Sequence, residues 1–237
     1  MSEAITITEI RAAADRLKGA ARFTPLLEAD NLNDLAGRRV LVKAECLQRT
    51  GSFKFRGGWS ALSAMSPEAR KRGVIAFSSG NHAQGVALAA KLHGAPAVII
   101  MPSDAPSMKI ANTRGYGAEV VLYDRWTESR EDIGAKLASD RGLTLIKPYD
   151  EPMVMAGQGT CGLEIAAQAA EAGVTRADVL VCTGGGGLLS GIALALEADA
   201  PGLRARPVEP KDFDDTRRSM EAGKRLANAE GVRSICD

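Results

Sequence analysis

Residues 74 to 101 of the chain read VIAFSSGNHAQGVALAAKLHGAPAVIIM and contain one complete strand–helix–strand pattern. Val74 to Phe77 and Ala97 to Met101 are short, continuously apolar runs. The alanine-rich stretch from Asn81 to His93 predicts a helix, which Gly94 ends. Two buried strands joined through a helix predict a βαβ unit with parallel strands and a right-handed crossover.

The same alternation continues on both sides of this unit. We expect further strands at Arg39–Glu45, Glu119–Tyr123, Leu143–Ile146 and Asp178–Cys182, and helices from Thr6, around Met108–Arg114, at Glu128–Ala138, within Met153–Ala172 and at Leu188–Glu197. The sequence therefore predicts an α/β fold with parallel sheets flanked by helices. We expect two lobes with a ligand cleft between them. We expect residues 51–146 to form the small lobe, and residues 1–50 and 147–237 to form a discontinuous large lobe that binds the cofactor.

Composition excludes several classes of protein. The 237 residues are 45% hydrophobic and 25% charged, which is the ordinary globular mixture. Thirty basic and 29 acidic residues leave a net charge of +1, so we expect neither nucleic acid nor a membrane as partner. No apolar run could span a bilayer, and no signal peptide opens the chain. The four cysteines form no CxxC pair, so we expect free thiols and a cytoplasmic protein.

Lys54 lies in the motif Ser52-Phe53-Lys54-Phe55-Arg56-Gly57-Gly58. Aromatic neighbours can desolvate an amine and lower its pKa, as a lysine that attacks a carbonyl requires. The alternative is a solvated lysine at the start of a helix, which is the commoner situation.

Ser78-Ser79-Gly80-Asn81-His82 lies between an apolar strand and a helix. These residues either cap the helix or form an anion site for a substrate carboxylate, and the pattern alone leaves both open.

Thr183-Gly184-Gly185-Gly186-Gly187-Leu188 follows another strand and opens another helix. Neither the dinucleotide fingerprint nor the P-loop pattern fits, which favours a cradle for a single phosphate. Gly157-Gln158-Gly159-Thr160 is a weaker signal and predicts a helix kink or a cleft-lining turn. Glu209, Phe213 and Asp215 lie in an acidic segment, and spacing alone favours a solvated loop over a Mg²⁺ or Ca²⁺ site.

Taken together and in this order, the motifs resemble the fold type II pyridoxal-phosphate enzymes, which share the tryptophan synthase β-like architecture. The resemblance is to the threonine dehydratase and serine racemase branch, and it runs from about residue 5 to the C-terminus. It implies a dehydratase (ammonia-lyase) of amino-acid metabolism that converts L-threonine or L-serine to a 2-oxo acid and ammonia. A serine racemase or a 3-hydroxyaspartate dehydratase is the alternative within the family.

The resemblance also implies roles for individual residues. Lys54 would hold pyridoxal 5'-phosphate as a Schiff base and then remove the Cα proton, and Ser79 would act as acid/base on the opposite face. The other implied cofactor contacts are Phe53, Asn81, Gly184, Gly185, Gly186, Gly187 and Leu188. The substrate carboxylate would meet Ser78, Ser79, Asn81 and His82. Glu209, the Phe213 carbonyl and Asp215 match that branch's divalent-cation site, for Mg²⁺, Ca²⁺ or Mn²⁺. A homo-oligomer, dimer or tetramer, is implied as well.

Two features depart from the family pattern. The chain stops at Asp237, whereas the family continues and supplies a residue that faces the ring nitrogen. Leu203–Val208 holds two arginines and a proline where the family has an apolar strand, so we expect either a sheet edge or an altered C-terminus. A truncated, catalytically silent fragment that binds only cofactor or a partner is therefore the alternative from another class.

Overall fold

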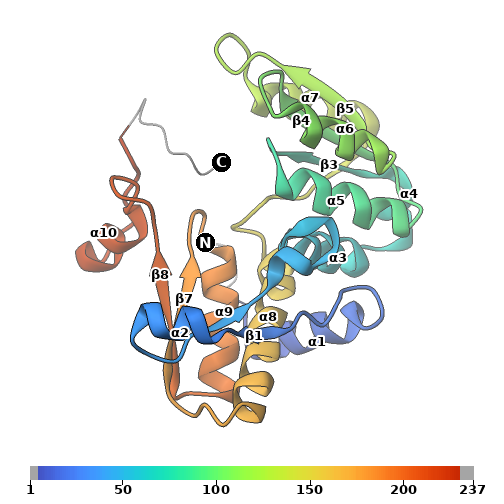
Figure 1. Cartoon of the computed structure of the whole chain (residues 1–237). Coiled ribbons are helices and arrows are strands. Elements are labelled where there is room, and N and C mark those ends of the chain that lie inside the picture. Colours follow the sequence, from blue (N-terminus) through green and yellow to red (C-terminus); the bar gives the residue numbers. More distant parts are fainter. Residues whose placement is uncertain (1–4, 230–237) are drawn as a thin grey trace.

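The computed structural model describes residues 5–229 (Figure 1). Its helices are α1 (Ile7–Leu17), α2 (Asp30–Ala36), α3 (Lys54–Ala64), α4 (Pro67–Arg72), α5 (Asn81–Leu92), α6 (Ser107–Gly115), α7 (Arg130–Arg141), α8 (Pro152–Glu171), α9 (Gly187–Asp199) and α10 (Asp215–Ala222), with short 3-10 turns η1 (Glu45–Leu47) and η2 (Arg49–Gly51). Its strands are β1 (Leu26–Glu28), β2 (Leu41–Lys43), β3 (Val74–Phe77), β4 (Ala97–Pro102), β5 (Glu119–Tyr123), β6 (Thr144–Leu145), β7 (Ala177–Cys182) and β8 (Leu203–Val208). Within residues 5–229, no helix is long and apolar enough to cross a membrane.

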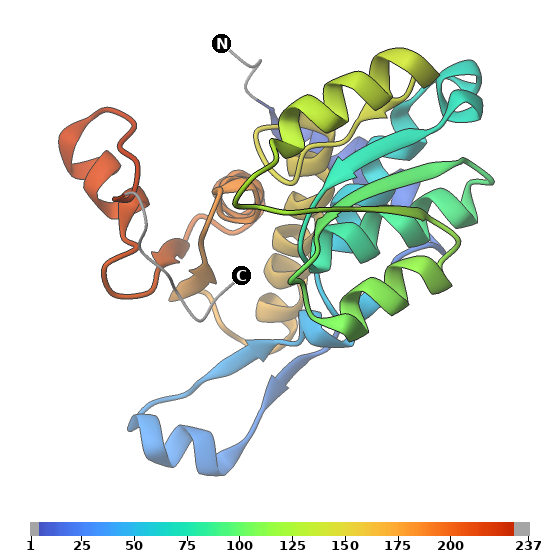
Figure 2. The same cartoon turned by 90° about the horizontal axis from the view of Figure 1, so that it is seen from above.

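A four-stranded parallel sheet with the strand order β5-β4-β3-β6 forms one body of the molecule. Strand β4 is buried along its whole length, as its continuous apolar run predicts. Helices α3 and α5 pack on one face of the sheet and α7 packs on the other (Figures 1 and 2). The predicted α/β fold with a parallel sheet between helices is confirmed.

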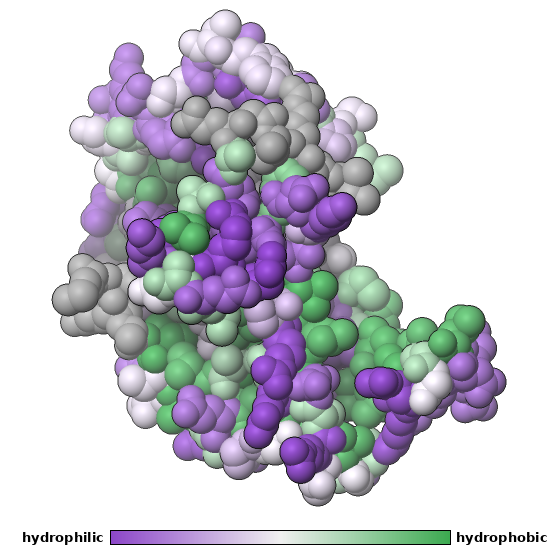
Figure 3. Space-filling view, turned by 90° about the vertical axis from the view of Figure 1, so that its left-hand side faces the viewer, coloured by the Kyte–Doolittle hydropathy of each residue, from purple (hydrophilic) through white to green (hydrophobic). Residues whose placement is uncertain are grey.

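Helices α8 and α9 and the parallel pair β7–β8 form a second apolar core. Helix α3 packs against both α5 and α8 and so joins this core to the four-stranded sheet. The antiparallel pair β1–β2 and helix α2 form an arm that projects from the body (Figures 2 and 3). Leu35 on this arm is 85% exposed. The residue boundaries of the two predicted lobes stay a prediction.

Gly157 to Thr160 lie inside the helix α8, so the expectation of a cleft-lining turn there is wrong, whereas the helix kink stays a prediction. A Cβ atom on Gly157 would lie 2.5 Å from the carbonyl oxygen of Arg56, and one on Gly191 would lie 2.6 Å from the amide nitrogen of Gly159. The glycines let the backbones of α3, α8 and α9 approach one another closely. This motif therefore positions helices.

Two predicted strands are shorter than expected. The strand expected over Arg39–Glu45 comprises only β2 before the chain turns into η1, and the one expected over Leu143–Ile146 comprises only β6. Leu203–Val208 does form a strand, β8, which has one hydrogen-bonded neighbour within the described chain. Arg206 pairs there with exposed Asp178, which fits the predicted sheet edge.

Candidate functional site

Lys54 is the first residue of helix α3, and its ammonium is mostly buried. Its Nζ donates a hydrogen bond of 3.0 Å to the carbonyl oxygen of Pro148 and lies 5.2 Å from the centre of the Phe53 ring. Burial lowers the pKa of Lys54 to about 8, and Cys182 nearby partly opposes this shift. The Phe55 ring is fully buried in the apolar core. Roughly a tenth of the Lys54 amine is therefore neutral and nucleophilic at pH 7, far more than of an ordinary lysine.

The loop Ser78–Asn81 joins β3 to α5. Helix α5 starts without a side-chain cap, because its N-cap residue is Gly80. Ser78 Oγ instead accepts a 3.1 Å hydrogen bond from the amide of Gly80. The first amides of a 12-residue helix are thus not bonded to a capping side chain, and helix amides of this kind attract anions. Of the two interpretations left open by the sequence, this geometry favours the anion site over capping.

His82 is buried next to this loop. Its Nε2 lies 3.0 Å from the carbonyl oxygen of Ile146, which can only accept, so we place the ring proton on Nε2. Burial, with a smaller contribution from the charge of Lys54, lowers the pKa of His82 to about 4. The ring is neutral and its Nδ1 is a buried acceptor without a hydrogen-bond partner among the described residues. An acceptor repels a carboxylate, so His82 would contribute its main-chain amide to the predicted carboxylate site.

The segment Ile146–Tyr149, which we call the crossover segment, leads from β6 to α8 and contacts three motifs. The Ile146 carbonyl accepts a hydrogen bond from His82 Nε2, and the Pro148 carbonyl accepts one from Lys54 Nζ. The Tyr149 ring lies against Gly185, where a Cβ atom would come within 2.1 Å of it. The crossover segment thus places three features beside one another: the Lys54 amine, the loop Ser78–Asn81, which we call the anion loop, and the loop Thr183–Gly187, which we call the glycine loop.

The glycine loop Thr183–Gly187 connects β7 to α9. Gly186 has φ +80°, a conformation that favours glycine, and it precedes a 13-residue helix whose start has no side-chain cap. Cβ atoms added at Gly184 or Gly186 would meet nothing within 4 Å. Helix amides without a capping side chain can bind an anion such as a phosphate group. A phosphate cradle and a nucleophilic amine together fit a phosphorylated aldehyde.

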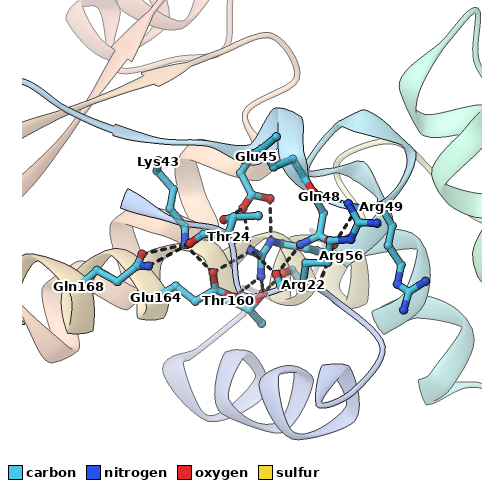
Figure 4. A network of polar contacts seen from close by, with 12 residues as sticks. Arg22, Thr24, Lys43, Glu45, Gln48, Arg49, Arg56, Thr160, Glu164 and Gln168 are labelled. Atoms are coloured by element: carbon cyan, nitrogen blue, oxygen red, sulfur yellow. Dashed lines mark hydrogen bonds and ion pairs between the residues drawn. The ribbon is translucent and has the colours of Figure 1, made fainter. Parts of the chain in front are cut away.

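A buried network of charges fixes the start of α3 (Figure 4). Arg56, only 1% exposed, bonds both carboxylate oxygens of Glu45 and both of Glu164, at 2.6 to 2.9 Å. Lys43 also bonds Glu164, at 2.5 Å, and Thr160 Oγ1 is 3.2 Å from the guanidinium. The sequence did not indicate this network, because its members come from three distant segments, at Lys43–Glu45, Arg56 and Thr160–Glu164, and no local spacing marks them.

The predicted cation site is less assembled. The two carboxylate oxygens of Glu209 accept hydrogen bonds from the main-chain amides of Thr216 and Arg217 at the start of α10. Asp215 Oδ1 accepts a bond from Asn228. Within the described part of the chain, no cluster of three or more His, Cys, Asp or Glu could hold a metal ion. The site at Glu209, Phe213 and Asp215, which would also use a carbonyl, stays a prediction.

Comparison with known proteins agrees with this geometry. Residues 17–237 match the family model described as pyridoxal-phosphate dependent enzyme. The L-threo-3-hydroxyaspartate ammonia-lyases of Saccharomyces cerevisiae and of a Pseudomonas species are 47% and 50% identical, over 98% and 95% of this chain and 70% and 69% of theirs. The crystal structure of the threonine deaminase from T.th. superposes with a TM-score of 0.90 at 45% identity, covering 97% of this chain and 73% of that one. The chain therefore belongs to the family of pyridoxal-phosphate dependent enzymes.

Proposed function

We propose that this chain is a carbon–nitrogen lyase that removes ammonia from a β-hydroxy amino acid, with L-threo-3-hydroxyaspartate as the favoured substrate. The sequence alone placed L-threonine and L-serine first. The two ammonia-lyases of 47% and 50% identity favour 3-hydroxyaspartate instead. The observation that carries the proposal is the Lys54 amine, whose pKa is about 8, held by the crossover segment beside the glycine loop.

The residues present fit pyridoxal phosphate. Lys54 would hold it covalently, the amides from Gly184 to Leu188 would bind its phosphate, and Phe53 and Asn81 would flank its ring. When bound, the cofactor supplies an aldehyde that takes the substrate nitrogen and a ring that withdraws electrons from Cα.

The chain's own residues then handle orientation and protons. The amides at the start of α5, with Ser78 and Ser79, bind the α-carboxylate and fix which Cα bond is labile. Lys54 Nζ, neutral once released, accepts the Cα proton. Its pKa of about 8 is close to the operating pH, which is the favourable range for a general base. The β-hydroxyl takes up one proton, which balances the proton that Lys54 removes from Cα, and leaves as water. The product released from the site then adds water and gives a 2-oxo acid and ammonia.

Serine racemase activity is the second candidate within the family. Ser79 carries this alternative, because its hydroxyl lies on the anion loop and would serve as an acid/base on the opposite face. A racemase forms D-serine from L-serine, whereas a lyase consumes L-serine and releases ammonia.

Spectroscopy and turnover test the proposal. The purified protein mixed with pyridoxal phosphate should absorb near the edge of the visible range and lose this band on borohydride treatment. It should release ammonia from L-threo-3-hydroxyaspartate faster than from L-serine or L-threonine. A Lys54→Ala variant should lose both properties, whereas Lys71→Ala, at an exposed position on α4, should keep them. No band and no turnover would reject the proposal and favour the silent-fragment alternative.

The divalent-cation site, assembly into a dimer or tetramer and a cytoplasmic location accompany this proposal. The cation site and the assembly rest on the resemblance to the family, and the location rests on the scattered cysteines. The cation site is tested below.

A further inference from the structure

A lysine from a separate helix lies over the anion loop. Lys109, in the first turn of α6, is half buried. A Cβ atom on Gly80 would lie 2.8 Å from Lys109 Nζ and 3.1 and 3.2 Å from its Cδ and Cε. The lysine stem therefore covers the face of Gly80, and its ammonium lies beside the loop that joins Ser78 to Asn81.

The fold holds Lys109 in this position. The Lys109 carbonyl accepts a 2.8 Å bond from Thr113 Oγ1, and Thr113 is fully buried. One turn along α6, Asn112 Nδ2 donates to Gln84 Oε1 on α5 at 3.3 Å. This bond joins α6 to the first turn of α5, and the main chain of Lys109, which lies on α6, is thereby positioned relative to α5. The Lys109 backbone is therefore held beside the anion loop, within reach of its side chain.

The loop consequently has two positive features close together. The uncapped amides of α5 can bind one carboxylate. The Lys109 ammonium can bind another. L-Serine and L-threonine carry one carboxylate each, whereas 3-hydroxyaspartate carries a second on Cβ, next to the carbon that bears the first. A substrate with two neighbouring carboxylates uses both features, and a substrate with one carboxylate uses only one.

We infer that Lys109 binds the side-chain carboxylate of the substrate and so selects dicarboxylic hydroxy amino acids over serine and threonine. This inference rests on the proposed lyase function and adds the residue that decides the substrate class. Two competing roles are a purely structural stem over Gly80 and a contact with the α-carboxylate, which all three substrates share.

Three variants separate these roles. Lys109→Met keeps most of the stem and removes the charge, Lys109→Arg keeps the charge, and Lys91→Met removes a charge from the exposed far end of α5. A hydrogen bond to a charged group is worth about tenfold to a hundredfold in affinity. Lys109→Met should therefore lower kcat/KM for L-threo-3-hydroxyaspartate about tenfold to a hundredfold more than for L-serine, mainly through KM. Lys109→Arg should restore part of this preference, and Lys91→Met should retain it.

An equal loss for both substrates, or a preference that persists in Lys109→Met, would overturn the inference while leaving the lyase proposal intact. Binding gives a second readout that needs no turnover. Titration calorimetry of the cofactor-loaded protein should show that succinate binds more tightly than propionate, and that Lys109→Met removes the difference. If the protein turns over no hydroxy amino acid, the lyase proposal fails, and the succinate preference still decides the role of Lys109.

Discussion

Replacing Arg56 with methionine should destabilise the protein strongly. The guanidinium is 1% exposed and makes four bonds of 2.6 to 2.9 Å to Glu45 and Glu164, whose side chains are 13% and 15% exposed. Burial alone raises the pKa of Glu45, but the bonds and charge of Arg56, the bond from Thr24 and the charge of Lys43 together outweigh burial and leave the pKa below its ordinary value. Without Arg56, Glu45 keeps its bond from Thr24 and Glu164 keeps its bond from Lys43. The variant thus buries two carboxylates with one nearby cation.

Breaking a buried ion pair by removing one partner costs about 3 to 5 kcal/mol. In a chain of this size, 1 kcal/mol lowers Tm by about 2 to 4 °C, so Arg56→Met should lower Tm by about 6 to 20 °C. The comparison variant is Arg125→Met, which breaks an exposed ion pair with Asp104. The Arg125 side chain is 41% exposed and the Asp104 side chain is 54% exposed. That loss should stay below about 1 kcal/mol.

Urea and thermal unfolding of both variants measure the difference. Because the pKa of Glu45 is lowered in the folded protein, its contribution is present above the unfolded pKa of about 4.3 and is lost as the pH falls through the folded value. The stability gap between wild type and Arg56→Met should therefore narrow in acid. Glu45→Gln is a milder second variant if Arg56→Met does not fold. An Arg56→Met protein within about 1 kcal/mol of wild type would refute the reasoning.

Three further predictions concern the site. Gly185→Ala would place a Cβ atom 2.1 Å from the Tyr149 ring, so this variant should lose about 1 to 3 kcal/mol of folding stability and bind the cofactor more weakly. A Gly185→Ala/Tyr149→Ala double variant should recover stability in thermal unfolding. With a pKa of about 8, roughly a tenth of the Lys54 amine is neutral at pH 7. The rate of cofactor attachment, measured by absorbance, should therefore rise with pH and level off above about pH 8. A rate that continues to rise to about pH 10.5 would indicate an ordinary lysine. If Glu209 and Asp215 hold a divalent cation, EDTA should lower Tm and a Glu209→Gln/Asp215→Asn variant should not respond, whereas an equal response from both proteins would remove the site.

The fold was largely predictable, because parallel strands buried on both faces leave continuous apolar runs. Val74–Phe77 and Ala97–Met101 are of this kind, and both are strands in the structure. The long alanine-rich helix expected within Met153–Ala172 is α8, displaced by one residue at each end. Short elements were less predictable. Arg39–Glu45 has strand-like composition, but only its middle part finds a pairing partner, β1.

The site was predictable motif by motif, but its assembly was not. Lys54, the loop at Ser78 and the tetraglycine each carry a local signal that follows from chemistry. The crossover segment carries none, because it acts through the carbonyls of Ile146 and Pro148, which any residue could supply. Contacts of this kind depend on tertiary structure and appear only once the chain is folded.

Lys54 is the amine that we propose carries the cofactor. Reduction of the cofactor-loaded protein with borohydride, followed by proteolysis and peptide mass mapping, identifies the labelled lysine. A single pyridoxyl group is expected on Lys54, in the peptide that contains Phe53 and Phe55. A label on another lysine, or a protein that takes up no label, would contradict it.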